Sequence, residues 1–189
     1  CKKFVFDVRY NPGGDLESIR GVLSYFLQEG NPMIYTVTRS GAKSVDVVEP
    51  IVHEEDIYRD CDVSREDIGK YRGYEFAVLM NQYTASAAEL FASNMRDYDL
   101  AILIGEKTFG KGCMQSTFNL EYFGVEGGFK LTTAWYLPPS EVGYHGIGIS
   151  PTEGYEIAFD QTVLDKYGNV YLIPAEEDNQ LAAAIAALQ

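Results

Sequence analysis

Three short loops carry the residues that could do chemistry. Each follows a segment rich in β-branched and aromatic residues, so each lies at the end of a predicted strand. In α/β sheets the carboxyl ends of the strands are where functional sites form. The three loops span residues 9–14, 81–89 and 105–112.

The loop at residues 81–89 places Ser86 among small alanines at a strand-to-helix junction. A serine at such a junction commonly does no more than cap the helix. The alternative is a nucleophile at the start of a helix, where the next amide, that of Ala87, helps to stabilise an oxyanion. Small neighbours leave room for a substrate backbone, so the loop predicts either a cap or a nucleophilic serine.

A serine nucleophile needs a base, and neither histidine is well placed to supply one. His53 lies in an acidic segment, and His145 lies in a glycine-rich one. Lysine can replace histidine when its surroundings hold the amine neutral. Lys111 stands between two glycines and near apolar residues, so it can turn inward, although an exposed turn lysine is the commoner case.

The loop around Lys111 also partly matches a phosphate-binding loop. Gly105, Gly110 and Lys111 fit that pattern, but Gly112 stands where a Ser or Thr hydroxyl should reach Mg²⁺. The residues that follow, 113–118, predict a strand rather than the helix whose N-terminus would hold the phosphates. We therefore reject a nucleotide site.

The elements that must position these loops alternate between strands and helices. This order predicts α/β layers joined by right-handed crossovers, with Asp15 as the N-cap of the first helix. Residues 53–72 are mainly charged, and we interpret them as an exposed acidic excursion with at most one short helix. The predicted strands span 4–9, 33–38, 44–48, 75–80, 100–104, 116–123 and 129–136, and the predicted helices span 15–28, 85–97 and 181–188.

The composition limits the possible partners. The chain has 189 residues, enough for one domain with a sizeable core, and a formal net charge of −13. This acidity opposes binding to nucleic acid or to anionic lipid, and no apolar run approaches the roughly 18 residues of a membrane span. Three scattered cysteines and two histidines predict no metal site and no closed disulfide framework. Because the chain starts at Cys1, we expect that preceding sequence has been removed.

Five segments, in order along the chain, resemble the C-terminal processing (tail-specific) protease family of serine peptidases. Each motif alone is weak, but five in the same order are specific. The resemblance covers the chain from about Phe4 to Pro151. The segments are residues 7–14, 84–89, 105–112, 131–138 and 146–151.

The resemblance implies a Ser–Lys catalytic pair formed by Ser86 and Lys111, whose separation of 25 positions matches that of the family. It also implies a glutamine four positions after the lysine that orients the amine, and Gln115 stands there. The family has a supporting aspartate near the end of the helix that begins at the serine, which Asp97 fits.

For the oxyanion hole the family uses the amide after the serine and one amide from the Asn-Pro-Gly-Gly turn. In this chain the resemblance implies Ala87 together with Gly13, with Gly14 as the less favoured choice. Glycine suits this position because backbone can approach a substrate closely there.

The implied fold is a mixed α/β core related to the ββα superhelix of crotonases and caseinolytic proteases. The whole chain, 1–189, then forms one catalytic core, with protein or peptide substrates, no cofactor and a possible homo-oligomeric state. The family works mostly outside the cytoplasm, at the cell envelope, in the periplasm or in secreted form. Three features depart from its pattern: no segment matches the PDZ domain, Thr152 replaces an acidic residue, and residues 53–72 match no family motif.

Three hypotheses remain open from the sequence. The first is a serine endopeptidase that cleaves proteins near their C-termini through an acyl-enzyme. The second is a non-catalytic module on the same fold that binds peptides or apolar ligands. The third, an acyl-CoA enzyme of crotonase type, lacks paired glutamates in its loops. Ser86, Lys111 and Gln115 together favour the first hypothesis, because a binding module needs no such set.

Overall fold

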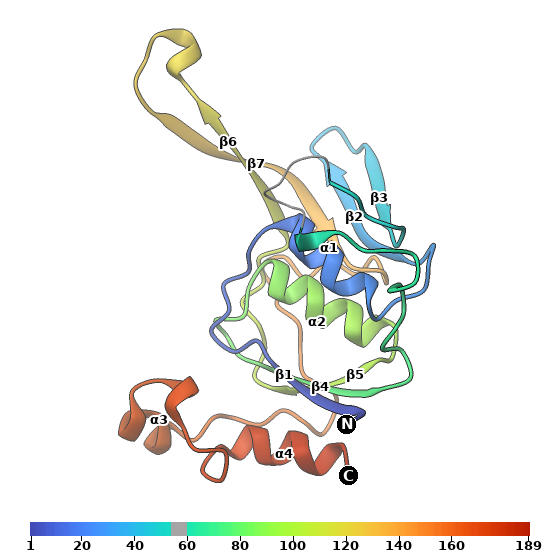
Figure 1. Ribbon diagram of the computed structural model, residues 1–189. Helices are drawn as coiled ribbons and strands as arrows, with labels where there is room; N and C mark the ends of the chain where they lie inside the picture. The colour runs from blue at the N-terminus through green and yellow to red at the C-terminus, as the bar shows by residue number, and fades with distance from the viewer. Residues whose placement is uncertain (54–59) are drawn as a thin grey trace.

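The computed structural model describes residues 1–53 and 60–189 (Figure 1). The strands are β1 (Lys3–Asp7), β2 (Pro32–Thr38), β3 (Lys43–Val47), β4 (Glu75–Met80), β5 (Ala101–Gly105), β6 (Cys113–Asn119) and β7 (Gly128–Leu137). The helices are α1 (Leu16–Ser24), α2 (Ala87–Asp97), α3 (Gln161–Tyr167) and α4 (Asn179–Ala187), with short 3-10 turns η2 (Glu121–Phe123) and η3 (Val170–Leu172).

A three-stranded parallel sheet in the order β1-β4-β5 forms the centre of the molecule. Alternate residues of β4 face opposite layers: Val78 and Met80 join the core with α1 and α2, whereas Ala77 and Leu79 join the core with α4. Figure 1 shows α1 and α2 on one side of these strands and α4 on the other. Because both faces are covered, β4 is almost entirely apolar, as is usual for parallel strands.

A second, antiparallel sheet in the order β3-β2-β7-β6 lies beyond the α1–α2 layer. Its strands β6 and β7 pair from Cys113↔Trp135 to Asn119↔Gly128 and extend away from the body as a long arm (Figure 1). The base of this arm packs into the molecule, whereas residues 117–119 and 121–132 are exposed.

Most of the predicted elements are confirmed, and the mixed α/β class with them. The Asp15 carboxylate caps α1 as expected, accepting hydrogen bonds from the amides of Glu17 and Ser18. Helix α1 ends at Ser24, earlier than predicted, because the amides of Tyr25 and Phe26 bond three residues back and tighten the last turn.

Other predictions differ from the structure in detail. Strand β6 spans Cys113–Asn119, so the strand predicted over 116–123 ends too late, and residues 121–123 form the turn η2 instead. The short helix α3 was not predicted. In the acidic excursion, residues 54–59 lie outside the described residues, and residues 65–73 form turns. One bridge between Ile51 and Val63 closes the base of this segment.

The C-terminal segment is attached to the first strand through Arg9. The Arg9 guanidinium is 3% exposed and donates to both carboxylate oxygens of Asp178, at 3.1 and 2.7 Å, and to Gln180. Burial alone would lower the pKa of Arg9, but its hydrogen bonds to Asp7 and Asp178 raise that pKa above the ordinary value. The arginine therefore stays charged and fixes α4 beside the loop that follows β1.

The described residues offer neither a membrane-spanning helix nor a cluster of metal-binding side chains. No helix among them has the length and apolar character required to cross a membrane. No three metal-binding side chains of His, Cys, Asp or Glu come together in the same part of the chain. The three cysteines are free thiols.

Candidate active site

Ser86 occupies a strained turn between β4 and α2. It is the N-cap residue of α2, but its φ of 57° and ψ of −120° differ from the extended conformation of an ordinary cap. A non-glycine residue with positive φ costs free energy, and such residues cluster at functional sites. A nucleophile on a tight strand–turn–helix corner has this kind of strained backbone.

The loop after β1 packs directly against this turn. The Ala85 amide donates to the Asn11 carbonyl at 2.9 Å, which joins the two loops. A Cβ built on Gly13 would lie 2.6 Å from the Ala85 carbonyl oxygen and 2.8 Å from the Ala87 nitrogen. Only a glycine lets the backbone come this close, and the φ of +91° at Gly13 also favours glycine.

Glu89 connects the serine turn to the lysine loop. Its carboxylate is fully buried and accepts hydrogen bonds from the amides of Ser86 at 2.9 Å, Gly110 at 2.7 Å and Lys111 at 2.7 Å. The Thr108 hydroxyl donates to the same carboxylate at 2.6 Å. One side chain thus joins the backbone at Ser86 to the backbone at Lys111, 25 positions further along the sequence.

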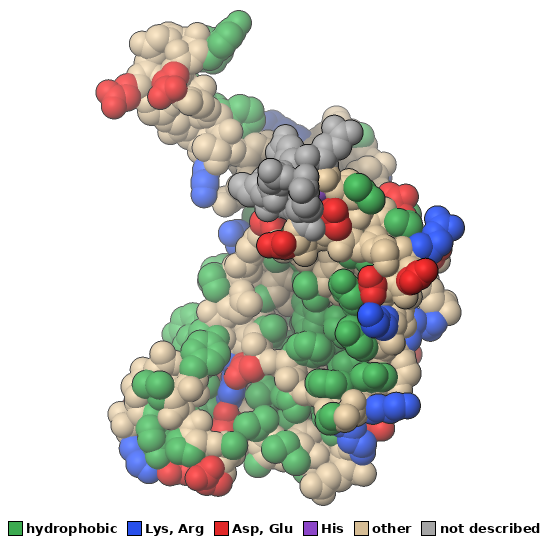
Figure 2. Space-filling view, in the orientation of Figure 1, with side chains coloured by type: hydrophobic (Ala, Val, Ile, Leu, Met, Phe, Trp, Pro, Cys, Tyr) green, Lys and Arg blue, Asp and Glu red, His purple; other side chains and the backbone are tan. Residues whose placement is uncertain are grey.

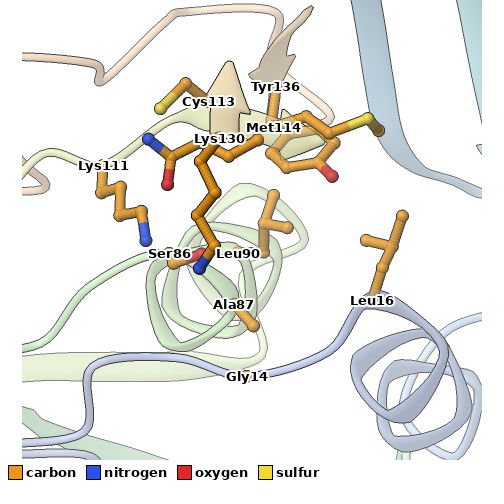
Figure 3. Close-up of a pocket in the computed structure, with 11 residues that line it drawn as sticks. Gly14, Leu16, Ser86, Ala87, Leu90, Lys111, Cys113, Met114, Lys130 and Tyr136 are labelled. Carbon is orange, nitrogen blue, oxygen red and sulfur yellow. The ribbon is translucent and has the colours of Figure 1, made fainter. Parts of the chain in front are cut away.

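These loops enclose a pocket of about 210 Å³ (Figure 3). In Figure 3 the amine of Lys111 points toward Ser86, and Ala87 and Gly14 lie on the other side of the serine. Gln115 also lines the pocket. The lining residues are Gly14, Leu16, Ser86, Ala87, Leu90, Lys111, Cys113, Met114, Gln115, Lys130 and Tyr136.

The structure brings five of the seven expected site residues to this pocket and places two elsewhere. Gly13 lines a neighbouring apolar cavity, and its amide donates to the Asn11 side chain at 2.9 Å. Asp97 lies at the opposite end of α2 from Ser86, about 16 Å along a helix of 11 residues. There it accepts a hydrogen bond from the Ser140 amide and pairs with Arg96.

The model of peptidase family S41 matches residues 1–154, most of the chain. The chain belongs to peptidase family S41. The part of the chain that this match leaves out contains α3 and α4, so Asp178 and Gln180, which bind Arg9, lie outside the matched region.

Relatives within family S41 carry the name of C-terminal processing proteases. One from Bartonella bacilliformis is 34% identical over 88% of this chain, and one from Synechocystis sp. is 34% identical over 81%. This chain spans about a third of the length of each, at 33% and 31%. The solved photosystem II D1 C-terminal processing protease aligns with a TM-score of 0.62 and 25% identity, covering 86% of this chain and 36% of that one.

Three residues at or beside this pocket were not assigned a role from sequence. Glu89 has a sequence signal, because a glutamate three positions after a helix-capping serine is the capping-box pattern. No sequence signal marks Lys130 or Tyr136. The pairing register of β7 with β6 brings them to the pocket, and the residues themselves do not reveal that register. Burial, with smaller contributions from Asp46 and Cys113, raises the pKa of Tyr136, so its phenol remains a neutral hydroxyl in the pocket.

Proposed function

We propose that this chain is the catalytic core of a serine endopeptidase that cleaves protein or peptide substrates near their C-termini. The observation that supports it is the meeting of Ser86, Lys111 and Gln115 at one pocket, from three separate elements. The names of the S41 relatives support the same class of reaction. By the same resemblance, we propose an extracytoplasmic location and a core related to the ββα superhelix of crotonases and caseinolytic proteases.

The proposed reaction proceeds through an acyl-enzyme. Ser86 Oγ attacks the peptide carbonyl while the neutral amine of Lys111 takes its proton. Lys111 then gives that proton to the leaving amine, and a water molecule hydrolyses the ester on Ser86. Gln115 hydrogen-bonds the lysine amine and orients it without adding a negative charge nearby.

The oxyanion forms beside the backbone of the serine turn. The amide of Ala87, the first residue of α2, has no acceptor among the described residues and lies at the positive end of the helix dipole. Gly14 lines the pocket, and its amide likewise has no acceptor in the described part of the chain. We therefore propose Ala87 and Gly14 as the donors, with Gly13 able to serve only if Asn11 releases its amide.

Cleavage of a denatured protein by the full-length protein tests this function. Ser86→Ala and Lys111→Ala should each lower kcat/KM by about a thousandfold or more, because the nucleophile and its base act as a unit. Lys107→Ala is the matched control, since Lys107 is an exposed lysine of the same loop and should leave the rate within about twofold. Undiminished cleavage by either of the first two variants would rule out the Ser–Lys pair.

A further inference from the structure

A second depression adjoins the catalytic pocket and shares Lys111 with it. Its cavity volume is about 450 Å³, and its lining is almost entirely apolar. The aromatic side chains in it are open to solvent: Phe109 is 63% exposed, Tyr83 is 52% exposed and Tyr10 is 38% exposed. The lining residues are Tyr10, Pro12, Tyr83, Ala85, Phe109 and Lys111.

The two tyrosines form a fixed platform. Their rings stack with centroids 5.0 Å apart and an angle of 17° between the planes. The amides of Tyr10 and Tyr83 both donate to the Asn81 side-chain oxygen, at 3.0 and 3.1 Å. Asn81 is 4% exposed, so a buried amide fixes both loops to each other. Tyr10 also has a φ of 58°, a strained conformation that these contacts hold in place.

The depression lies on the side of the catalytic pocket where the residues after the scissile bond would sit. Ala85 lines it directly before Ser86, and Lys111 lines both it and the catalytic pocket. In the proposed reaction Lys111 protonates the leaving amine, so the residues that follow the scissile bond depart on the lysine side. Figure 2 shows hydrophobic side chains gathered at the left edge of the molecule, where the loops after β1, β4 and β5 lie in Figure 1.

The lining also defines the chemistry of the occupant. Among the described residues that line the depression, Lys111 is the one charged side chain, and three aromatic rings present their faces or edges. Aromatic rings favour stacked or edge-to-face partners and gain from removal of their apolar surface from water. A small or acidic substrate residue would leave this aromatic surface in water.

We propose that Tyr10, Tyr83 and Phe109 form a specificity subsite for a large apolar side chain, best an aromatic one, at the first or second residue after the scissile bond. This inference rests on the proposed peptidase function. It assigns the three rings to recognition of the leaving fragment, and it gives none of them a part in the bond-breaking steps.

Matched peptides test the subsite. Cleavage sites are first mapped by mass spectrometry on a denatured protein, and one cleaved sequence is then made with Phe or with Gly at the first or second position after the bond. The full-length protein should cleave the better Phe peptide roughly tenfold faster, in kcat/KM, than the Gly peptide. Tyr83→Ser and Phe109→Ser should each reduce this ratio to about threefold or less.

The Gly peptide serves as the internal control for folding. A glycine makes no contact with the rings, so dividing the Phe rate by the Gly rate of the same variant removes any general loss of activity from the comparison. Tyr122→Ser, at an exposed tyrosine on the tip of the arm, should keep the tenfold ratio.

The outcomes separate this inference from the function on which it rests. Equal rates for Phe and Gly peptides, or an unchanged ratio in both ring variants, would overturn the subsite while leaving the peptidase intact. Cleavage no greater than that of Ser86→Ala with every peptide would overturn the proposed function, and the subsite with it.

Discussion

Because the Glu89 carboxylate accepts hydrogen bonds from the amides of both Ser86 and Lys111, the geometry of the proposed pair depends on a side chain that touches neither reacting group. The Glu89 side chain is fully buried, and every hydrogen bond that its carboxylate receives comes from the loops at residues 81–89 and 105–112. The four groups that contact it all donate, and its two oxygens accept two hydrogen bonds each. Glu89 is thus a positioning residue.

Replacing Glu89 by glutamine should weaken both stability and turnover. The amide keeps one acceptor oxygen but turns its NH₂ group toward buried N–H donors, which then lose their acceptor. We expect the free energy of unfolding to fall by about 2 kcal/mol, measured by urea denaturation. We also expect kcat to fall more than KM changes, because the alignment of Ser86 with Lys111 is disturbed before substrate contacts are. Glu126→Gln, at an exposed position of the arm, is the matched control and should change neither stability nor kcat. If Glu89→Gln had a normal kcat, the carboxylate would not be what aligns the two loops.

At the scale of single elements, helix α1 depends on its cap. The Asp15 carboxylate accepts hydrogen bonds from the amides of Glu17 and Ser18 and from the Ser18 hydroxyl. Partial burial opposes the charge on Asp15, but these hydrogen bonds outweigh it and hold the pKa of Asp15 below its ordinary value. The cap is therefore a carboxylate at neutral pH.

Replacing Asp15 by alanine should lower the free energy of unfolding by about 1 kcal/mol at pH 7. Because the pKa of Asp15 is lower in the folded state, the stabilisation is present above the unfolded value of about 3.9 and is lost as the pH falls through the folded value. The difference in free energy of unfolding between the parent protein and Asp15→Ala, measured by urea titration, should therefore shrink from pH 7 to pH 3. Asparagine is uncharged but also caps helices well, so the free energy of unfolding of Asp15→Asn should exceed that of Asp15→Ala by a nearly constant amount across this pH range. A parent–alanine difference that does not change with pH would contradict the carboxylate cap.

The sequence was sufficient to predict elements whose own residues determine them. Strand β4 was predicted with its correct bounds because both of its faces are apolar, and α2 followed from helical spacing after the serine turn. The loop motifs likewise sufficed to propose Ser86 and Lys111. Contacts between distant segments could not be predicted from local residues. Arg9 donates a hydrogen bond to Asp178, which is 169 positions away in the sequence. Lys130 lines the pocket only because of the pairing register of β6 and β7.

At the scale of the whole molecule, the arm and the body differ in how they are stabilised. Two cores cover the faces of the β1-β4-β5 sheet, whereas the outer half of the arm is exposed on both faces. Tyr122 is 91% exposed and Phe123 is 74% exposed at its tip, although both are aromatic. Burial of apolar surface is the main source of folding free energy, so the tip contributes little to the stability of the body.

Replacing residues 120–127 at the tip by Asn-Gly should therefore leave the body intact. The new two-residue turn joins Asn119 to Gly128, which already face each other across the hairpin, and Asn-Gly favours the tight turn that such a connection needs. We expect the free energy of unfolding, from urea midpoints, to change by less than about 0.5 kcal/mol, as for substitutions at exposed positions. Leu103→Ala, which truncates a fully buried side chain of β5, should lower it by about 2–5 kcal/mol in the same assay and so shows that the assay detects loss of core packing. A loss of more than about 1 kcal/mol on shortening the arm would contradict the view that the tip contributes little to the stability of the body.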